Sequence, residues 1–352
     1  SRAEMSWAHG LGQEEDAWRA PLGRAEAAIE EATRLAPGSV DAWTLRASVA
    51  SLRVELLRAR ELDRSAASAA LREAAESALA IDATSTIATT AIACIEQDAA
   101  HEQIHRGVDP SDGLARARRL FERARDLAPG DPLLLCNLAS VDRTLCEWIQ
   151  ARGGDPGEAY GRAISIYEEA IRVSPRLYEA AYELGETHSA YGVWLESMGR
   201  DPTLHYGKAR EALDRALDIR PDHVPTLQSM VGVLWLIGRR EIQGGADPRK
   251  AFEPALELLR LAEEATLRAP VVASLRGKLL CDLAEALLDA GEEATWELGK
   301  AAEALKRGAL APEALLRDGW LHRVRARRLR LRGEDPYPEV SLARESLGRA
   351  VA

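Results

Sequence analysis

Two histidines carry the clearest chemical potential in this chain. His101 and His105 stand four residues apart in the string His-Glu-Gln-Ile-His. Side chains at i and i+4 share one face of a helix, so both imidazoles could bind a zinc ion while the Glu acts as general base of a hydrolase. A catalytic zinc needs a third protein ligand, and Gly107 and Asp109 do not continue the longer motif that would supply one. A helix end without metal is therefore the favoured interpretation, and a zinc-dependent hydrolase stays the alternative hypothesis.

The densest positive stretch is a run of seven arginines between Arg317 and Arg332. Guanidinium groups at this density could dock an acidic partner or phosphate groups. The favoured interpretation is the solvated face of a helix whose packing residues are Leu321, Val324, Leu329 and Leu331.

The remaining composition excludes several classes of protein. Asp and Glu total 56 against 46 Lys and Arg, for a net charge of -10, so we expect neither nucleic acid nor a membrane as a partner. The four cysteines form no Cys-x-x-Cys pair and predict buried thiols in a reducing cytoplasm. There is no Gly-rich phosphate loop, no kinase catalytic motif and no Gly-x-Ser-x-Gly elbow. We therefore expect no catalytic domain and no cofactor.

A repeat of 46 residues positions these side chains. One marker is Ala-x-x-x-x-Pro, with successive prolines at Pro129, Pro175 and Pro221. A second marker is Gly-x-Asp-Pro, with aspartates at Asp109, Asp155, Asp201 and Asp247. Two markers that share one period make coincidence a poor explanation, so the chain is predicted to be a repeat array.

Each marker has a mechanical reason. Gly ends a helix in the left-handed conformation, Asp caps the next helix, Pro opens that helix, and the later Pro ends it. One period therefore predicts helix, loop, helix, loop, and a chain with only 5% aromatic residues favours an all-α fold. We predict one domain over residues 1–352, with partial first and last units and with units ending near residues 37, 83, 129, 175, 221, 270 and 312.

The residues between the markers resemble the tetratricopeptide repeat. Ala163, Tyr167 and Ala170 precede Pro175 in a small–large–small pattern, and Leu184-Gly185 follows it in the first helix of the next unit. The resemblance covers essentially the whole chain, although the family period is 34 residues rather than 46. It implies a right-handed α-solenoid of about seven stacked antiparallel helix pairs that serves as a protein-interaction scaffold.

The resemblance also implies a ligand surface. In the family, the first helix of each pair lines a concave groove that binds a protein or peptide. Aromatic residues and Arg dominate such contacts, although some of these side chains could instead belong to the core. The predicted groove residues are Gln97, Arg143, Tyr182, Glu186, Gln228 and Trp235.

Loops such as Arg-Gly-Gly-Asp-Pro resemble the non-catalytic C-terminal regions of large bacterial serine/threonine protein kinases. That resemblance implies the regulatory or sensing region of a larger bacterial signalling protein. The regulatory arm of a transcription activator is a further alternative, because such proteins also carry helical repeats.

Overall fold

The computed structural model describes residues 18–58, 60, 62–265, 269–308 and 314–351. Within them the chain forms fifteen α-helices and no strand. The helices are α2 (Arg19–Leu35), α3 (Val40–Arg58), α4 (Ser65–Ile81), α5 (Thr86–His105), α6 (Ser111–Leu127), α7 (Pro132–Ala151), α8 (Gly157–Val173), α9 (Tyr178–Ser197), α10 (Thr203–Ile219), α11 (Val224–Gln243), α12 (Pro248–Ala265), α13 (Ala269–Asp289), α14 (Thr295–Arg307), α15 (Ala314–Leu331) and α16 (Tyr337–Val351).

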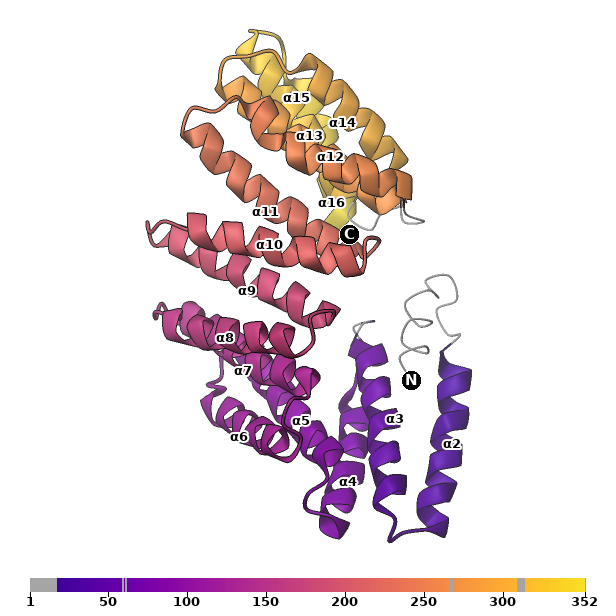
Figure 1. The fold of residues 1–352 in the computed structure, drawn as a ribbon. Helices are drawn as coiled ribbons and strands as arrows, with labels where there is room; N and C mark the ends of the chain where they lie inside the picture. The colour runs from indigo at the N-terminus through magenta and orange to yellow at the C-terminus, as the bar shows by residue number, and fades with distance from the viewer. Residues whose placement is uncertain (1–17, 59, 61, 266–268, 309–313, 352) are drawn as a thin grey trace. The chain divides into compact units, whose positions relative to one another are not determined.

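Helices α3 to α16 form seven pairs, and the two members of each pair pack against each other. Figure 1 shows the antiparallel course of one such pair, α9 and α10. We call the odd-numbered members first helices and the even-numbered ones second helices. Successive second helices end 46 residues apart, at Leu35, Ile81, Leu127, Val173, Ile219 and Ala265. The predicted all-α solenoid of stacked helix pairs is confirmed.

The chain divides into two compact units, residues 1–175 and residues 176–352, which we call the N-terminal and C-terminal units. In the N-terminal unit α5 contacts the first helices α3 and α7. In the C-terminal unit α11 contacts α9 and α13, and α13 contacts α15. The single-domain assignment stays a prediction, and its boundary near residue 312 lies outside the described residues.

The loop between α5 and α6 confirms the predicted role of Gly and shows how Asp bonds the start of the next helix. Gly107 has φ 70°, and the Val108 N–H behind it bonds to the Gln103 carbonyl at 2.8 Å, which closes α5. Asp109 Oδ1 then accepts the Ser111 N–H at 2.9 Å at the start of α6. Pro110 occupies the cap rather than the first helical position. Left-handed glycines recur at Gly153, Gly199, Gly245, Gly291 and Gly333.

Small residues set how closely the helices of a pair approach. A Cβ on Gly185 would lie 2.6 Å from Leu213 Cγ, and one on Gly277 would lie 2.5 Å from Leu305 Cγ. Gly277 and Leu305 lie two periods after Gly185 and Leu213, so the 46-residue register still holds in α13 and α14.

None of the helices in the described residues combines the length and apolar character that a bilayer crossing requires. Cys136, Cys146 and Cys281 are buried and Cys94 is half-buried, each as a free thiol. Burial raises the pKa of Cys281 to about 12, so this thiol is protonated at neutral pH.

Candidate functional site

The predicted groove residues of the N-terminal unit lie on α5 and α7. Gln97 is half-buried and donates from Nε2 to Ser140 Oγ at 2.9 Å, across the contact between these two first helices. Arg143 lies one turn beyond Ser140 on α7 and is also half-buried. The polar side chain of Gln97 therefore couples two successive first helices.

In the C-terminal unit, Tyr182 belongs to an aromatic cluster between α9 and α11. Its ring stacks on Tyr178 with centroids 5.9 Å apart, and His223 meets it edge-on at 6.1 Å. The Tyr178 hydroxyl shares a hydrogen bond with Thr226 Oγ1 at 2.7 Å. Glu186 and Gln228 are half-buried on the same two helices. The structure thus brings Tyr182 to α11, the helix that carries Gln228.

Trp235 joins a series of cation–π contacts along three first helices. The Arg239 guanidinium lies 4.9 Å from the Trp235 ring centroid. Lys278 Nζ, on α13, lies 5.8 Å from Trp235 and 6.0 Å from Trp320 on α15. Arg323 covers Trp320 at 3.8 Å. We call Arg239, Trp235, Lys278, Trp320 and Arg323 the aromatic–cation row. Of these, only Trp235 is among the predicted groove residues, and Arg323 belongs to the arginine run.

The row is anchored by a buried carboxylate. Lys278 Nζ donates to Asp282 Oδ2 at 2.8 Å, and the Asp282 side chain is 8% exposed. Burial raises the pKa of Asp282, and Lys278 opposes that change. This ion pair holds the ammonium group of Lys278 between the two indole rings.

The histidine pair does lie on one helix face. The rings of His101 and His105 meet edge-on with centroids 4.7 Å apart, and His101 Nδ1 lies 3.8 Å from Glu147 Oε2. In the part of the chain that the structure describes, no three His, Cys, Asp or Glu side chains gather as a metal site would require.

The arginine run on α15 faces acidic residues of α13. Arg323 donates to Glu285 at 2.9 Å, and Arg327 pairs with both Glu285 and Asp289. Arg317 donates to Ser274 Oγ at 2.6 Å. These arginines therefore bind neighbouring helices of their own chain, in addition to facing solvent.

In the N-terminal unit, two carboxylates on first helices each bind arginines from the two neighbouring second helices. Glu96 on α5 accepts from Arg72 of α4 at 2.9 Å and from Arg116 of α6 at 2.8 Å. Burial acts to raise the pKa of Glu96, but the two guanidinium groups hold it below its usual range. Each bridge links two second helices across the first helix between them.

The second bridge lies one period later. Asp142 on α7 accepts from Arg118 of α6 at 2.6 Å and from Arg162 of α8 at 3.0 Å. Its side chain is 1% exposed, and Oδ2 has no hydrogen-bond partner. Burial acts to lower the pKa of Arg118, but Asp142 raises it overall.

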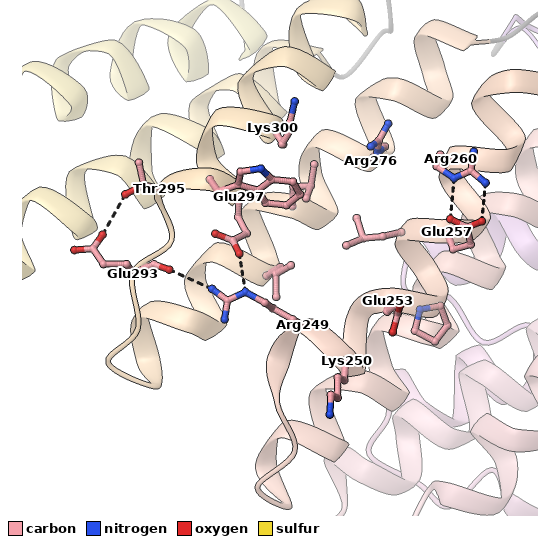
Figure 2. A pocket seen from close by; sticks show the side chains of 15 residues that line it. Arg249, Lys250, Glu253, Glu257, Arg260, Arg276, Glu293, Thr295, Glu297 and Lys300 are labelled. Atoms are coloured by element: carbon pink, nitrogen blue, oxygen red, sulfur yellow. Dashed lines mark hydrogen bonds and ion pairs between the residues drawn. The ribbon is translucent and has the colours of Figure 1, made fainter.

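A cavity of about 1090 Å³ occupies the corresponding place in the C-terminal unit, between α12 and α14 over α13 (Figure 2). Its apolar lining comes from Leu256 and Pro254 of α12, from Trp296 of α14 and from the buried Leu280 and Leu283 of α13. The charged lining residues are Arg249, Lys250, Glu253, Glu257, Arg260, Arg276, Glu293, Glu297 and Lys300.

One end of the cavity is closed by Arg249. Its Nε donates to the buried Glu297 at 2.9 Å, and Nη2 donates to the Glu293 carbonyl at 3.4 Å, as Figure 2 shows. Nη1 also donates to Glu292 at 2.6 Å. Hydrogen bonding to Glu292 and then to Glu297 raises the pKa of Arg249. Sequence reasoning missed this cavity, because it looked only at the first-helix surface.

Comparison with known proteins finds likeness only at the level of structure. No family model and no curated protein matches the sequence. Among solved structures, YrrB, described as a TPR protein with an unusual peptide-binding site, is 14% identical with a TM-score of 0.37 over 68% of this chain and 93% of that one.

Two further solved structures are similar to the chain. Pseudomonas aeruginosa PilF is 15% identical with a TM-score of 0.43 over 78% of this chain and 92% of that one. Human IFIT1, solved as a dimer with PPP-AAAA, is 13% identical with a TM-score of 0.43 over 94% of this chain and 68% of that one. Scores of this size assign neither a family nor a ligand to this chain.

Proposed function

We propose that the protein is a non-catalytic scaffold that binds a peptide segment of a partner protein on its first-helix surface. The aromatic–cation row carries the proposal. It presents two half-buried indole rings on α11 and α15, held at fixed places by Lys278. Trp and Arg side chains on a rigid support are the groups that most often dominate protein binding energy.

The predicted groove residues extend this surface toward α9. Tyr182 and Glu186 lie on α9, the first helix before the row, Gln228 lies on α11 beside it, and each is half-buried. Such side chains leave an edge for a ligand while their packing keeps them in place, which lowers the entropy lost on binding. Gln97 and Arg143 are proposed to serve in the same way on the N-terminal unit.

Selection of peptides from a random phage-displayed library on the immobilised chain tests the proposal. Peptides recovered on the wild type should bind the Trp235→Ala and Trp320→Ala variants at least about tenfold more weakly, which corresponds to about 1.4 kcal/mol. Trp148→Ala is the matched control, because Trp148 is also half-buried and has Arg152 over its ring at 5.1 Å. If Trp235→Ala and Trp320→Ala bind the peptides as the wild type does, or if Trp148→Ala weakens binding as much as they do, the proposal fails.

We further propose that the scaffold is the regulatory region of a larger bacterial signalling protein, such as a serine/threonine kinase, and acts in the cytoplasm. The Gly-x-Asp-Pro loops support this context, because the Asp side chain accepts the same backbone N–H hydrogen bond in three successive loops of the chain. The gene sequence upstream of Ser1 tests it. A kinase domain there would support the proposal, and a DNA-binding domain would favour the transcription-activator alternative.

A further inference from the structure

We propose that the cavity between α12 and α14 is a second docking site, which takes one amphipathic α-helix of a partner protein. The apolar stripe of that helix would lie on Leu256, Pro254 and Trp296, above the buried Leu280 and Leu283, with an acidic residue beside the stripe facing Lys250. The site is formed mainly by second helices, so it is separate from the aromatic–cation row on the first helices.

The repeat register explains why this groove is open. Leu280 lies four 46-residue periods after Glu96 and three after Asp142. By the same count Leu256 replaces Arg72 and Arg118, and Lys300 replaces Arg116 and Arg162. The arginine–carboxylate–arginine bridge of the N-terminal unit thus becomes leucine, leucine and lysine, all three of which line the cavity. An apolar floor replaces an ion bridge at the same place in the fold.

The dimensions of the groove suit a helix. Helices α12 and α14 each pack on α13, but among their described residues no Cα of α12 lies within 8 Å of a Cα of α14, so only side chains bridge the two helices. Arg249 closes one end, and at the other end Glu263 accepts from Arg276 at 3.1 Å and pairs with Arg307 of α14 at 2.9 Å. From Arg249 to Glu263 α12 advances about 21 Å, the length of about four turns of a partner helix. Such a helix would contact three helices at once.

Exposure and charge indicate what the partner presents. The Trp296 side chain of α14 is 65% exposed beside the apolar floor, although large aromatic residues are usually covered. Among the described residues, neither Lys250 nor Glu253 has an ion-pair partner, whereas Arg249, Arg276 and Lys300 are paired within the chain. A helix with an apolar stripe, a carboxylate near Lys250 and a basic group near Glu253 satisfies both charges.

A model peptide tests the site directly. The probe is a fluorescein-labelled 16-residue peptide of Leu, Glu, Lys and Ala, with leucines at helical spacing and glutamates beside them. Fluorescence anisotropy should show saturable binding with Kd below about 100 µM. The same residues in scrambled order, and the same peptide with Pro at its centre, should bind at least about tenfold more weakly. Equal binding of the scrambled or the Pro peptide, or no saturable binding of the probe, would overturn the proposal.

Three variants locate the binding. Trp296→Ala should weaken probe binding at least about tenfold. Lys250→Glu should also weaken probe binding, and its effect should be larger in low salt than in high salt. The double variant Leu256→Arg/Leu280→Glu restores the bridge of the N-terminal unit next to Lys300 and should abolish binding. Tyr337→Ala on α16 is the control, because Tyr337 is 70% exposed in the same unit and does not line the cavity.

Circular dichroism identifies a double variant that fails to fold, in which case Trp296→Ala and Lys250→Glu decide the question. Wild-type affinity in Trp296→Ala would refute the site. The Trp235→Ala variant should keep full affinity for the probe, so failure of this site and failure of the first-helix surface are separate results.

Discussion

Removing the carboxylate of Asp142 should destabilise the N-terminal unit more than any other single bridge substitution. The side chain is 1% exposed and accepts hydrogen bonds from Arg118 and Arg162, whose side chains are 29% and 36% exposed. The loss of one partner from a buried ion pair typically costs about 3–5 kcal/mol, because the remaining charge stays desolvated.

In the Asp142→Ala variant both guanidinium groups would stay partly exposed to solvent and would keep a second carboxylate partner, which reduces this cost. Arg118 also bonds to Glu122 at 3.1 Å, and Arg162 bonds to Glu158 at 2.7 Å. We therefore expect Asp142→Ala to lower the free energy of unfolding by about 2 kcal/mol. Glu96→Ala should cost about 1 kcal/mol, because its arginines are 39% and 53% exposed and water screens them more fully.

Urea denaturation followed by far-UV circular dichroism measures these differences, and hydrogen exchange of the α7 amides assigns them to the correct unit. Glu158→Ala is the matched control, since it removes a 90% exposed partner of Arg162 and should cost less than about 0.5 kcal/mol. The reasoning is refuted if Asp142→Ala costs no more than Glu158→Ala, or less than Glu96→Ala.

Three further predictions use other parts of the chain. Burial, together with His205, lowers the pKa of His188 from 6.5 to about 4. As the pH falls from 6.5 toward 4, the unfolded chain is protonated at this residue before the folded chain is, so the folded state loses stability. Thermal melts of His188→Gln should show less of this loss. Gly277→Ala should cost about 1–3 kcal/mol in urea titrations because of Leu305, whereas Gly299→Ala, with open space, should stabilise α14 by about 0.5–1 kcal/mol. Metal analysis should find less than one zinc per chain; near-stoichiometric zinc that His101→Ala removes would contradict this.

The fold followed from the sequence because its signals are local. A left-handed Gly and a capping Asp act within a few residues, so Gly107 and Asp109 predict the loop without reference to the rest of the chain. Their recurrence at one period then predicts the stack of pairs. The prediction that Pro opens the second helix was less accurate at Pro110, since helix ends are defined only to within a residue or two.

The candidate site was less accessible to sequence reasoning because it depends on contacts between helices. Trp235 was selected for its residue type, but nothing near it in the chain indicates Lys278, which lies 43 residues away. The cavity is indicated in the sequence only when the repeat units are compared with one another. When positions are aligned at the 46-residue period, Glu96 and Asp142 correspond to Leu280, and this change from acid to leucine is visible without any structure.

Three aligned repeat positions together distinguish the outer grooves, since Leu234 of α11 also places a leucine at the central position but has Arg210 and Pro254 at the flanking ones. Where the central position holds Glu96 or Asp142, two arginines of the flanking second helices turn inward to the carboxylate and cannot serve a partner without breaking a buried bridge. Where the central position holds Leu280, no carboxylate draws Lys300 inward, and Lys300 bonds instead to Glu303 on its own helix at 2.9 Å. Leu256, Pro254 and Trp296 then present apolar surface between charged residues, which is the polarity that we expect of a surface for an amphipathic helix. Because the backbone register is the same in both units, the proposed difference in binding comes from side-chain identity at the three aligned positions rather than from a change of fold.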